Sequence, residues 1–281
     1  MYHRTLISTA TLAANLGNAD WAICDCRHDL QDVEAGRRAH EDGHIPGSHF
    51  LHLDDDLSGQ KTGSNGRHPL PEPARVLTKL GQIGVARATQ VVAYDAQGGM
   101  YAARLWWLLR WLGHDAVAVL DGGIGTWTAE ERPLTRDLPA ARSAILERAP
   151  GALPVDATFV LTHLDGNGMQ LIDARAPDRF AGQNETLDPV AGHIPGAVNR
   201  FFKLNLDEQG RFKPATALRQ EFATLLADRN PREVVHQCGS GVSACHNLLA
   251  MEHAGLPGSR LYPGSWSEWC ADGGRPVVTH E

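Results

Sequence analysis

The sequence repeats itself once, and this internal repeat constrains the fold more than any other feature. Residues 23–27 match residues 171–175, and residues 43–47 match residues 192–196, where both copies read Gly-His-Ile-Pro-Gly. Further matches in the same order are 91–95 with 234–238, 120–123 with 262–265, and Trp127 with Trp269. The separation between partners stays between 142 and 149 positions. Two copies are too few for a solenoid, so we predict two tandem domains of one fold.

Each copy alternates between patterns typical of strands and of helices. Predicted strands lie at 21–26, 90–94, 117–120, 170–174 and up to residue 237, and predicted helices at 9–16, 74–80 (capped by Gly81), 100–112, 157–164 and 244–255. Ser8 and Asp156 precede the first helix of each copy and suit helix N-caps. A polar loop is expected between the first strand and Gly-His-Ile-Pro-Gly. This alternation predicts an α/β fold, in which a parallel sheet carries helices on both faces.

The stretch Thr135 to Pro154 breaks the pattern, since it is rich in Ala, Arg and Pro and lies between the two copies. We therefore predict a first domain at 1–134, a linker at 135–154 and a second domain at 155–281. The chain has 281 residues, of which 42% are hydrophobic, enough to form packed cores.

The end of one strand in the second copy carries the strongest chemical signal. Cys238 follows the apolar pair Val234-Val235 and opens a run of small residues that leads into a helix: Gly239, Ser240, Gly241, Val242, Ser243 and Ala244. Backbone N–H groups converge in such a loop, and the helix dipole adds positive potential. We expect the Cys238 sulfur to be largely ionised, with Ser240 and Ser243 hydrogen-bonding toward it.

Other interpretations of this loop are weaker. Most lone cysteines are small buried hydrophobes, but few of those sit in a Gly/Ser loop between a strand and a helix. A P-loop would continue with Gly-Lys-Ser/Thr, which is absent here. A cysteine-dependent phosphatase needs an arginine at the far end of the loop to hold a phosphoryl dianion, and Ala244 stands there instead.

The run Cys-Gly-Ser-Gly-Val-Ser-Ala resembles the active loop of the rhodanese-type sulfurtransferases. It is most similar to the 3-mercaptopyruvate branch, because the thiosulfate-preferring branch carries Arg-Lys where Gly239-Ser240 stand here. The resemblance covers nearly the whole chain and implies two rhodanese-like domains, of which the first is catalytically inactive. Asp95 occupies the position in the first copy that Cys238 holds in the second, and an aspartate cannot carry a transferable sulfur.

The resemblance also implies roles outside the loop. Arg179 matches the first of two arginines that bind the substrate carboxylate, but Asp188 stands where the second is expected, and an aspartate would repel that group. His44 matches a histidine near the active site of the family and is a candidate for proton handling. His193 is expected to be structural. Arg27 and Arg175 each follow an aspartate by two positions, which favours structural ion pairs.

The expected activity is sulfur transfer from 3-mercaptopyruvate or thiosulfate, through a Cys238 persulfide, to cyanide, a thiol or a thioredoxin-like protein. Gly239 to Ala244 would stabilise the thiolate and persulfide, and no metal or organic cofactor is implied. We expect a modest preference for mercaptopyruvate that is weakened by Arg179→Ala, although both donors stay open. A persulfide carrier or regulatory protein with slow turnover needs the same loop and remains an alternative.

Composition narrows the partners and the compartment. The net charge of −7 disfavours nucleic acid, and no apolar run is long enough to span a membrane. The first 18 residues do not resemble a signal peptide, and five cysteines suit free thiols in a reducing cytoplasm. Cys24 and Cys26 are separated by one residue, so they do not form a Cys-x-x-Cys pair, and no metal site is predicted.

Overall fold

The computed structural model describes residues 2–165 and 168–279, and these form two compact units. Unit 1 contains Met1–Gly59, Pro71–Ala152 and Glu208–Phe212, and unit 2 contains Gln60–Leu70, Leu153–Asp207 and Lys213–Glu281. Each unit therefore includes a short segment from the opposite half of the sequence. Residues 135–152, most of the predicted linker, group with unit 1.

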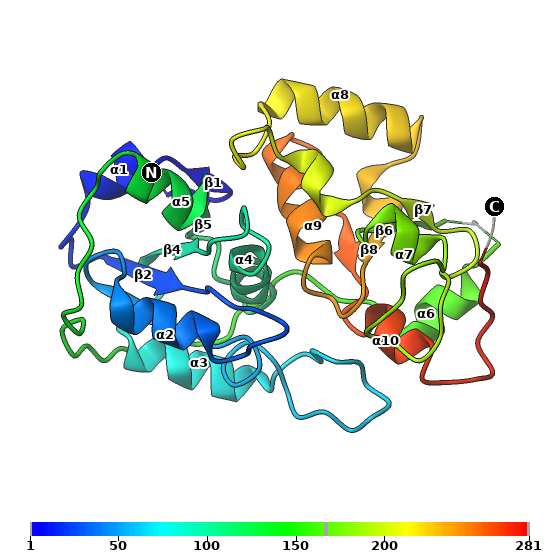
Figure 1. The fold of residues 1–281 in the computed structure, drawn as a ribbon, viewed down its shortest axis with the longest axis horizontal. Helices are drawn as coiled ribbons and strands as arrows, with labels where there is room; N and C mark the ends of the chain where they lie inside the picture. The colour runs from blue at the N-terminus through cyan, green and yellow to red at the C-terminus, as the bar shows by residue number, and fades with distance from the viewer. Residues whose placement is uncertain (1, 166–167, 280–281) are drawn as a thin grey trace. The chain divides into compact units, whose positions relative to one another are not determined.

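Unit 1 is built on a five-stranded parallel sheet (Figure 1). Its strands, in spatial order, are β1 (Leu6–Ile7), β5 (Val117–Leu120), β4 (Gln90–Tyr94), β2 (Trp21–Asp25) and β3 (Ser48–Phe50). Its helices are α1 (Thr9–Ala13), α2 (Ala35–Asp42), α3 (Pro73–Gln82), α4 (Ala102–Trp111) and α5 (Gly123–Ala129). The central strands are almost entirely buried, as expected of a parallel sheet covered on both faces.

The two faces of this sheet are covered by different helices. On one face, Leu12 of α1 and Trp127 of α5 join Val92 and Ala118 in an apolar core, and Figure 1 shows α1 and α5 together on that side. Side chains alternate along a strand, so Val91 and its neighbours face the opposite side, where α4 packs against β4 and β5. The three tryptophans of α4 are buried, in agreement with a packing role.

Unit 2 repeats the plan on a four-stranded parallel sheet. Its strand order is β7 (Val198–Asn199), β6 (Gln170–Asp173), β8 (Val234–Gln237) and β9 (Arg260–Leu261). Helices α6 (Ala157–Thr162) and α10 (Ser265–Trp269) share one core with the sheet. Helix α9 (Ala244–His253) packs against β8 and β9, and α8 (Ala215–Leu226) packs on α9 (Figure 1). The remaining elements are the short helix α7 (Pro177–Phe180) and the 3-10 helices η1 (Phe202–Asn205) and η2 (Pro231–Glu233).

The predicted α/β fold is confirmed, and so are both helix caps. The Ser8 side chain accepts the Thr11 N–H, and the Asp156 side chain accepts the Phe159 N–H. Two local predictions were wrong. The expected polar loop before the first Gly-His-Ile-Pro-Gly contains α2, whose buried residues are only Gly36 and His40, so no large apolar side chain marks it in the sequence. Gly81 lies inside α3, which continues to Gln82, because packing overrides the local cost of glycine.

A buried histidine in the central strand of unit 2 makes stability depend on pH. Burial, assisted by the charge of Arg200, lowers the pKa of His236 to about 3. The unfolded chain takes up a proton below pH 6.5, whereas the folded chain resists it until about pH 3. Stability is therefore lost as the pH falls through this window, by roughly 2 kcal/mol at pH 5.

Replacing His236 with leucine, which does not titrate, should reduce the pH dependence of unfolding. Urea unfolding between pH 7 and 5 is expected to give a slope smaller by nearly one bound proton for His236→Leu than for the wild-type chain. Equal slopes for the two chains would contradict the prediction.

Candidate active site

The cysteine loop joins the C-terminal end of β8 to the N-terminus of α9. Gln237 ends the strand, Cys238 follows directly, and the helix begins at Ala244. The Gly241 N–H points back to the Cys238 sulfur, with 3.2 Å between nitrogen and Sγ. Cys238 is buried (2% exposed), yet its sulfur has a polar neighbour, and the ten-residue helix behind it directs its positive end toward the loop.

The segment after β9 holds this loop in place. The Ser265 hydroxyl accepts the Cys238 N–H at 3.1 Å, and the Trp266 N–H donates to the Cys238 carbonyl at 3.0 Å. Ser267 N–H donates to the Gly239 carbonyl at 2.9 Å. Ser265 adopts a positive φ of 54°, an unfavourable conformation that is maintained by these contacts. The main-chain N–H and carbonyl of Cys238 are therefore both hydrogen-bonded, and this fixes the position of its side chain.

A histidine contacts the first serine of the loop. His68 Nδ1 lies 2.7 Å from Ser240 Oγ, and both side chains are buried. His68 belongs to the Gln60–Leu70 segment, which is part of unit 2. Ser243 is the N-cap residue of α9, although its side chain makes no capping hydrogen bond. A hydroxyl bonded to an imidazole, two residues from the sulfur in sequence, can relay a proton to a group that reacts there.

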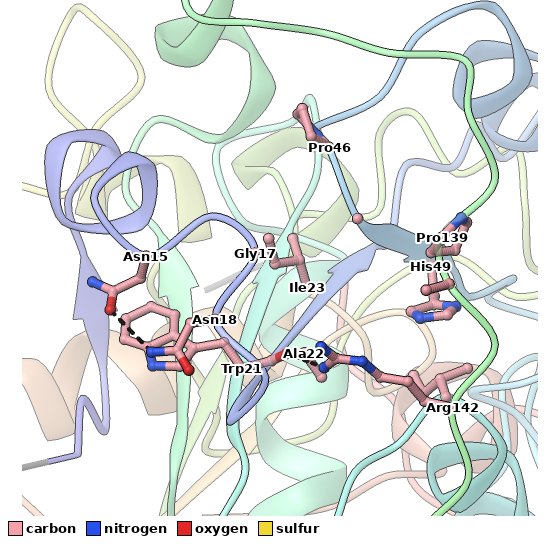
Figure 2. Close-up of a pocket in the computed structure, with 13 residues that line it drawn as sticks. Asn15, Gly17, Asn18, Trp21, Ala22, Ile23, Pro46, His49, Pro139 and Arg142 are labelled. Carbon is pink, nitrogen blue, oxygen red and sulfur yellow. Dashed lines mark hydrogen bonds between the residues drawn. The ribbon is translucent and has the colours of Figure 1, made fainter.

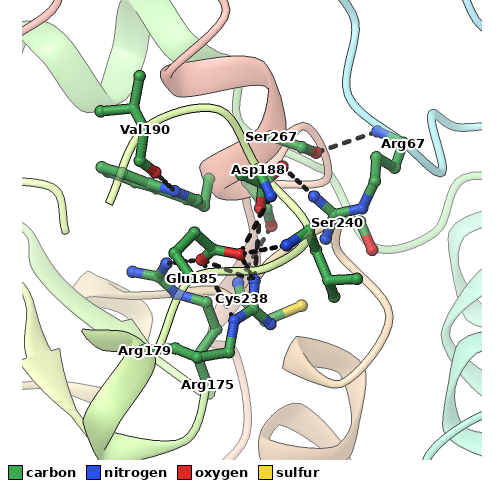
Figure 3. A network of polar contacts seen from close by, with 12 residues as sticks. Arg67, Arg175, Arg179, Glu185, Asp188, Val190, Cys238, Ser240 and Ser267 are labelled. Atoms are coloured by element: carbon green, nitrogen blue, oxygen red, sulfur yellow. Dashed lines mark hydrogen bonds and ion pairs between the residues drawn. The ribbon is translucent and has the colours of Figure 1, made fainter. Parts of the chain in front are cut away.

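An arginine and carboxylate cluster lies beside the loop (Figure 3). Arg179 Nη2 is 2.8 Å from Glu185 Oε1 and 3.4 Å from Asp188 Oδ2, and Arg67 pairs with Asp188. Burial would raise the pKa of Glu185, but the Leu187 N–H and Arg179 lower it below its usual range. Burial raises the pKa of Asp188, and Arg67 opposes this only in part. Asp188 is thus held among cations and does not stand as an unpaired charge.

The two Asp-x-Arg sequences form the expected ion pairs in both units. Arg27 Nη2 lies 2.6 Å from Asp25, and Arg175 Nη2 lies 2.7 Å from Asp173. Each arginine also donates to the carbonyl of the first glycine of its Gly-His-Ile-Pro-Gly turn. These arginines therefore tie each turn to its strand. Burial lowers the pKa of Arg175, but Asp173, Glu185 and the Cys238 sulfur together raise it above its ordinary value.

His44 belongs to unit 1 and is held by the main chain. Its Nδ1 lies 2.7 Å from the His40 carbonyl, and its Nε2 lies 3.1 Å from the Asp137 carbonyl. His193, its counterpart in unit 2, contacts the Phe180 carbonyl through Nδ1 and stacks on the Phe180 ring. Such contacts are typical of histidines that fix a turn. The proton-handling role of His44 stays a prediction that these contacts do not favour.

Asp95 occupies in unit 1 the position that Cys238 occupies in unit 2, and its carboxyl group accepts several main-chain N–H groups. One carboxylate oxygen accepts the N–H groups of Gln97 and Gly99, and the other accepts those of Tyr101 and Ala102, all at 2.8 to 2.9 Å. Burial raises the pKa of Asp95, but four donors aimed at its two oxygens are fully used only by the ionised form. The loop after the equivalent strand in unit 1 is thus a nest of N–H groups around an anion.

The other four cysteines are buried within their units. Burial raises the pKa of Cys24 to about 12, and it raises the pKa values of Cys26 and Cys270 as well. All five cysteines are free thiols. Cys245 lies in α9 and donates its S–H to the Gly241 carbonyl. Cys238 differs from the other four in its place, because its sulfur accepts the Gly241 N–H in the loop between β8 and α9.

Unit 1 also has a pocket of its own, with a volume of about 250 Å³ (Figure 2). Arg142 crosses it and donates to the carbonyls of Ala19 and Trp21. Burial, together with the charge of Arg142, lowers the pKa of His49 in the pocket wall to about 4, so this imidazole is neutral at neutral pH. The wall contains no cysteine, hydroxyl or carboxylate side chain, and we assign it no chemistry.

One group of side chains in unit 1 has the residue types of a metal site. The ligand atoms of His28, His52 and Asp54 lie within 4.8 Å of one another. However, both ring nitrogens of His52 are already used, since Nε2 contacts the Val33 carbonyl at 2.9 Å and Nδ1 accepts the Asp55 N–H. A metal ion would have to break these bonds, so the arrangement does not favour one.

Arg67 and His68 were not predicted from the sequence, although a signal was present. The pair Gly66-Arg67 and the pair Gly210-Arg211 are separated by 144 positions, within the range of the repeat. Both pairs lie in the short segments that group with the opposite unit, Gln60–Leu70 and Glu208–Phe212. Matching basic residues in two otherwise polar loops could have indicated a shared role. Their proximity to the sulfur depends on tertiary structure and could not be predicted.

The fold and this loop define the class of protein: the chain belongs to the rhodanese family. The model of the rhodanese-like domain matches it twice, at residues 8–130 and 156–272. Over 277 residues the chain is 47% identical to a Pseudomonas aeruginosa protein named "Probable 3-mercaptopyruvate sulfurtransferase", covering 98% of both chains. It is 33% identical to the thiosulfate sulfurtransferase of Cricetulus griseus, covering 95% of this chain and 92% of that one.

A solved structure agrees with these relatives. SseA from Escherichia coli, described as a 3-mercaptopyruvate sulfotransferase with the rhodanese fold, superposes with a TM-score of 0.81 at 29% identity. The match covers 94% of this chain and 99% of SseA. Separately, none of the helices in the described part of the chain is long and apolar enough to cross a membrane.

Proposed function

We propose that this protein is a sulfurtransferase that carries the transferred sulfur as a persulfide on Cys238. The observation that carries the proposal is the Gly241 N–H directed at the Cys238 sulfur, at the N-terminus of α9. That contact stabilises negative charge on the Cys238 sulfur of the thiolate, which attacks the donor and is regenerated when the persulfide gives up its outer sulfur. The names of the relatives support the same reaction.

The reaction proceeds in two steps that balance. The Cys238 thiolate attacks the outer sulfur of the donor, and a new S–S bond forms as the donor's bond to that sulfur breaks. With 3-mercaptopyruvate the C–S bond breaks and pyruvate leaves as its enolate, which takes up a proton. With thiosulfate the S–S bond breaks and sulfite leaves with the electron pair. A thiolate or cyanide then attacks the outer sulfur of the persulfide and regenerates the Cys238 thiolate.

The contact between Ser240 and His68 suits the proton step. A hydroxyl near the sulfur can donate to the departing enolate, and the imidazole 2.7 Å away can restore that proton. Sulfite leaves without needing a proton, so this pair favours 3-mercaptopyruvate as the donor. The loop sequence and the 47% identical relative support the same preference.

Other parts of the proposal concern the setting of the reaction. Unit 1 is catalytically inactive, because the Asp95 carboxylate fills the nest where a transferable sulfur would have to sit. The acceptor is a small thiol or a thioredoxin-like protein. A reducing compartment such as the cytoplasm suits the five free cysteines.

Mass spectrometry of the intact protein tests the persulfide directly. After incubation with 3-mercaptopyruvate or thiosulfate and removal of the donor, one sulfur atom per chain should be gained, and peptide mapping should place it on Cys238. Cyanide should remove this atom and release thiocyanate. A chain that gains no sulfur from either donor would rule out the proposal.

Steady-state turnover separates an enzyme from a persulfide carrier. An enzyme regenerates Cys238 repeatedly when a small thiol or cyanide is supplied in excess, with ping-pong kinetics. A carrier would gain its sulfur stoichiometrically and then stop.

A further inference from the structure

Two arginines from distant parts of the sequence converge beside the sulfur loop. We propose that the facing N–H groups of Arg67 and Arg179 bind the oxyanion end of the sulfur donor, so that Arg67 is a specificity-determining residue. The shared ligand chemistry is the carboxylate of mercaptopyruvate or the sulfur-bound oxygens of thiosulfate. This inference rests on the proposed function and names the donor site that it requires.

Gly239, the residue after the nucleophile, is the point of convergence. A Cβ atom built on Gly239 would lie 2.8 Å from Arg67 Nη2, 3.6 Å from Arg179 Nη1 and 3.7 Å from Arg179 Nη2. Both guanidinium groups therefore lie on the side of Gly239 where any other residue would carry its side chain. A ligand atom at that point would be within hydrogen-bond distance of Arg67 and a few tenths of an ångström beyond it from Arg179, so an oxyanion with two or three oxygens there could contact both arginines beside Cys238.

Each guanidinium group has one end already occupied and one end available. Arg67 pairs with Asp188 through Nη1, and Arg179 contacts Glu185 and Asp188 through Nε and Nη2. Among the residues that the structure describes, none offers a hydrogen-bond acceptor to Arg67 Nη2 or Arg179 Nη1. Because a guanidinium carries five N–H donors in a fixed plane, its occupied edge orients the available one.

The arginines of this cluster are more exposed to solvent than the carboxylates that hold them. The Glu185 and Asp188 side chains are buried (2% and 3% exposed), whereas those of Arg67 and Arg179 are 29% and 20% exposed. The carboxylates thus form a buried layer that holds the arginines, and the arginines are the charges that a ligand can reach. A purely structural network would not require Arg67 Nη2 and Arg179 Nη1 to face the same point beside Gly239.

The same geometry assigns a role to Asp188. From its charge alone, this aspartate was expected to repel a carboxylate. In the structure Asp188 lies between the two arginines and contacts both, so it holds them at the spacing described above. The second cation of the site is then Arg67. It comes from the Gln60–Leu70 segment, which lies in the first half of the sequence, and not from the motifs around Cys238.

The experiment measures anion binding without sulfur transfer. Pyruvate and sulfite, the two donors without their transferable sulfur, are the probes, and the full chain with Cys238→Ser is the background. Binding is followed by NMR line broadening of the pyruvate methyl resonance and by calorimetry for sulfite. The variants are Arg67→Gln, Arg67→Lys, Asp188→Asn and Gly239→Ala. Arg219→Gln removes a cation from α8 and is the matched control.

Loss of one charged hydrogen-bond donor should weaken binding of the preferred probe about tenfold or more in Arg67→Gln. Arg67→Lys should recover part of that loss, since the charge returns without the planar fork. Asp188→Asn should bind more weakly, because the amide keeps one oxygen acceptor and one of the two arginines loses the oxygen that holds it. Gly239→Ala should bind weakly because its methyl group fills the site. Arg219→Gln should bind like the background chain.

With Cys238 restored, Arg67→Gln should raise the KM of the preferred donor by a similar factor and leave kcat within about threefold. The probe that responds to Arg67 identifies the oxyanion recognised, carboxylate or sulfite. A structural role alone predicts a lower unfolding temperature for Arg67→Gln with unchanged probe binding, and this result would overturn the inference. Asp188→Asn gives an independent test if Arg67→Gln does not fold, since probe binding equal to that of the background chain would also overturn it.

The failure of this inference can be distinguished from the failure of the proposed function. If Cys238 gains sulfur but Arg67→Gln binds pyruvate and sulfite as tightly as the background chain does, the sulfurtransferase proposal stands and the arginine site is rejected. If Arg67 controls probe binding but neither donor adds sulfur to Cys238, the site binds anions and the proposed reaction is wrong.

Discussion

Cys238→Ser is expected to abolish sulfur uptake and to reduce sulfur transfer by a factor of about 10⁴ or more, the scale seen when a covalent nucleophile is removed. A serine hydroxyl remains protonated at neutral pH, and it cannot form a persulfide. The fold should be unaffected, because the loop is held by main-chain contacts from Ser265 and Trp266 that do not involve the sulfur. Intact-mass analysis and thiocyanate release measure the two effects.

Cys270→Ser is the matched control for this substitution. Cys270 is a buried cysteine of the same unit, and burial raises the pKa of its thiol. Its replacement should leave both sulfur uptake and turnover close to the wild-type values. If the gain of one sulfur persists in Cys238→Ser and disappears in Cys270→Ser, the nucleophile is Cys270 and the assignment to Cys238 is refuted.

Gly241→Ala should damage both stability and activity. Gly241 has a φ of 76°, and a Cβ atom there would lie 2.3 Å from the Pro263 carbonyl oxygen. The loop must shift, and with it the N–H that donates to the Cys238 sulfur. We expect the free energy of unfolding to fall by about 2–4 kcal/mol, since backbone strain and a steric clash combine. A displacement of this size should slow sulfur uptake roughly 100-fold.

Two other glycines separate the causes of this effect. Gly210 has nearly the same φ, 74°, but no atom within 4 Å of a built Cβ, so Gly210→Ala should cost only the backbone term of roughly 1–2 kcal/mol. Gly273 has neither a positive φ nor a close neighbour, and Gly273→Ala should be neutral. Chemical denaturation of the three variants provides the comparison. Equal losses for Gly241→Ala and Gly210→Ala would show that the contact with Pro263 is unimportant.

Much of the fold could be predicted because its signals are local. The apolar runs 90–94 and 117–120 have the bounds of β4 and β5, and Ser8 and Asp156 cap their helices as expected. Some of the elements that were missed bury little of their own surface. Helix α2 is an example, because it buries only Gly36 and His40 and its remaining residues are polar. Its position depends on contacts such as that of His40 with Asp25, which no local pattern contains.

The candidate site divides in the same way. The Cys238 loop is continuous in sequence, so its small residues and its place between a strand and a helix could be identified directly. Arg67 and His68 reach the loop from more than 160 positions away, and nothing in their own neighbourhood indicates the destination. Asp188 was interpreted from its charge alone, and its effect depends on Arg67, which lies 121 positions earlier.

The four N–H groups around Asp95 hold a carboxyl group that cannot leave unit 1, since it is part of a side chain of the unit itself. The corresponding position in unit 2 must load and unload its cargo in every cycle if it transfers sulfur. In unit 1 this position is therefore permanently occupied by the Asp95 side chain. In unit 2 the matching residue is Cys238, whose sulfur can take up and release another atom in that reaction.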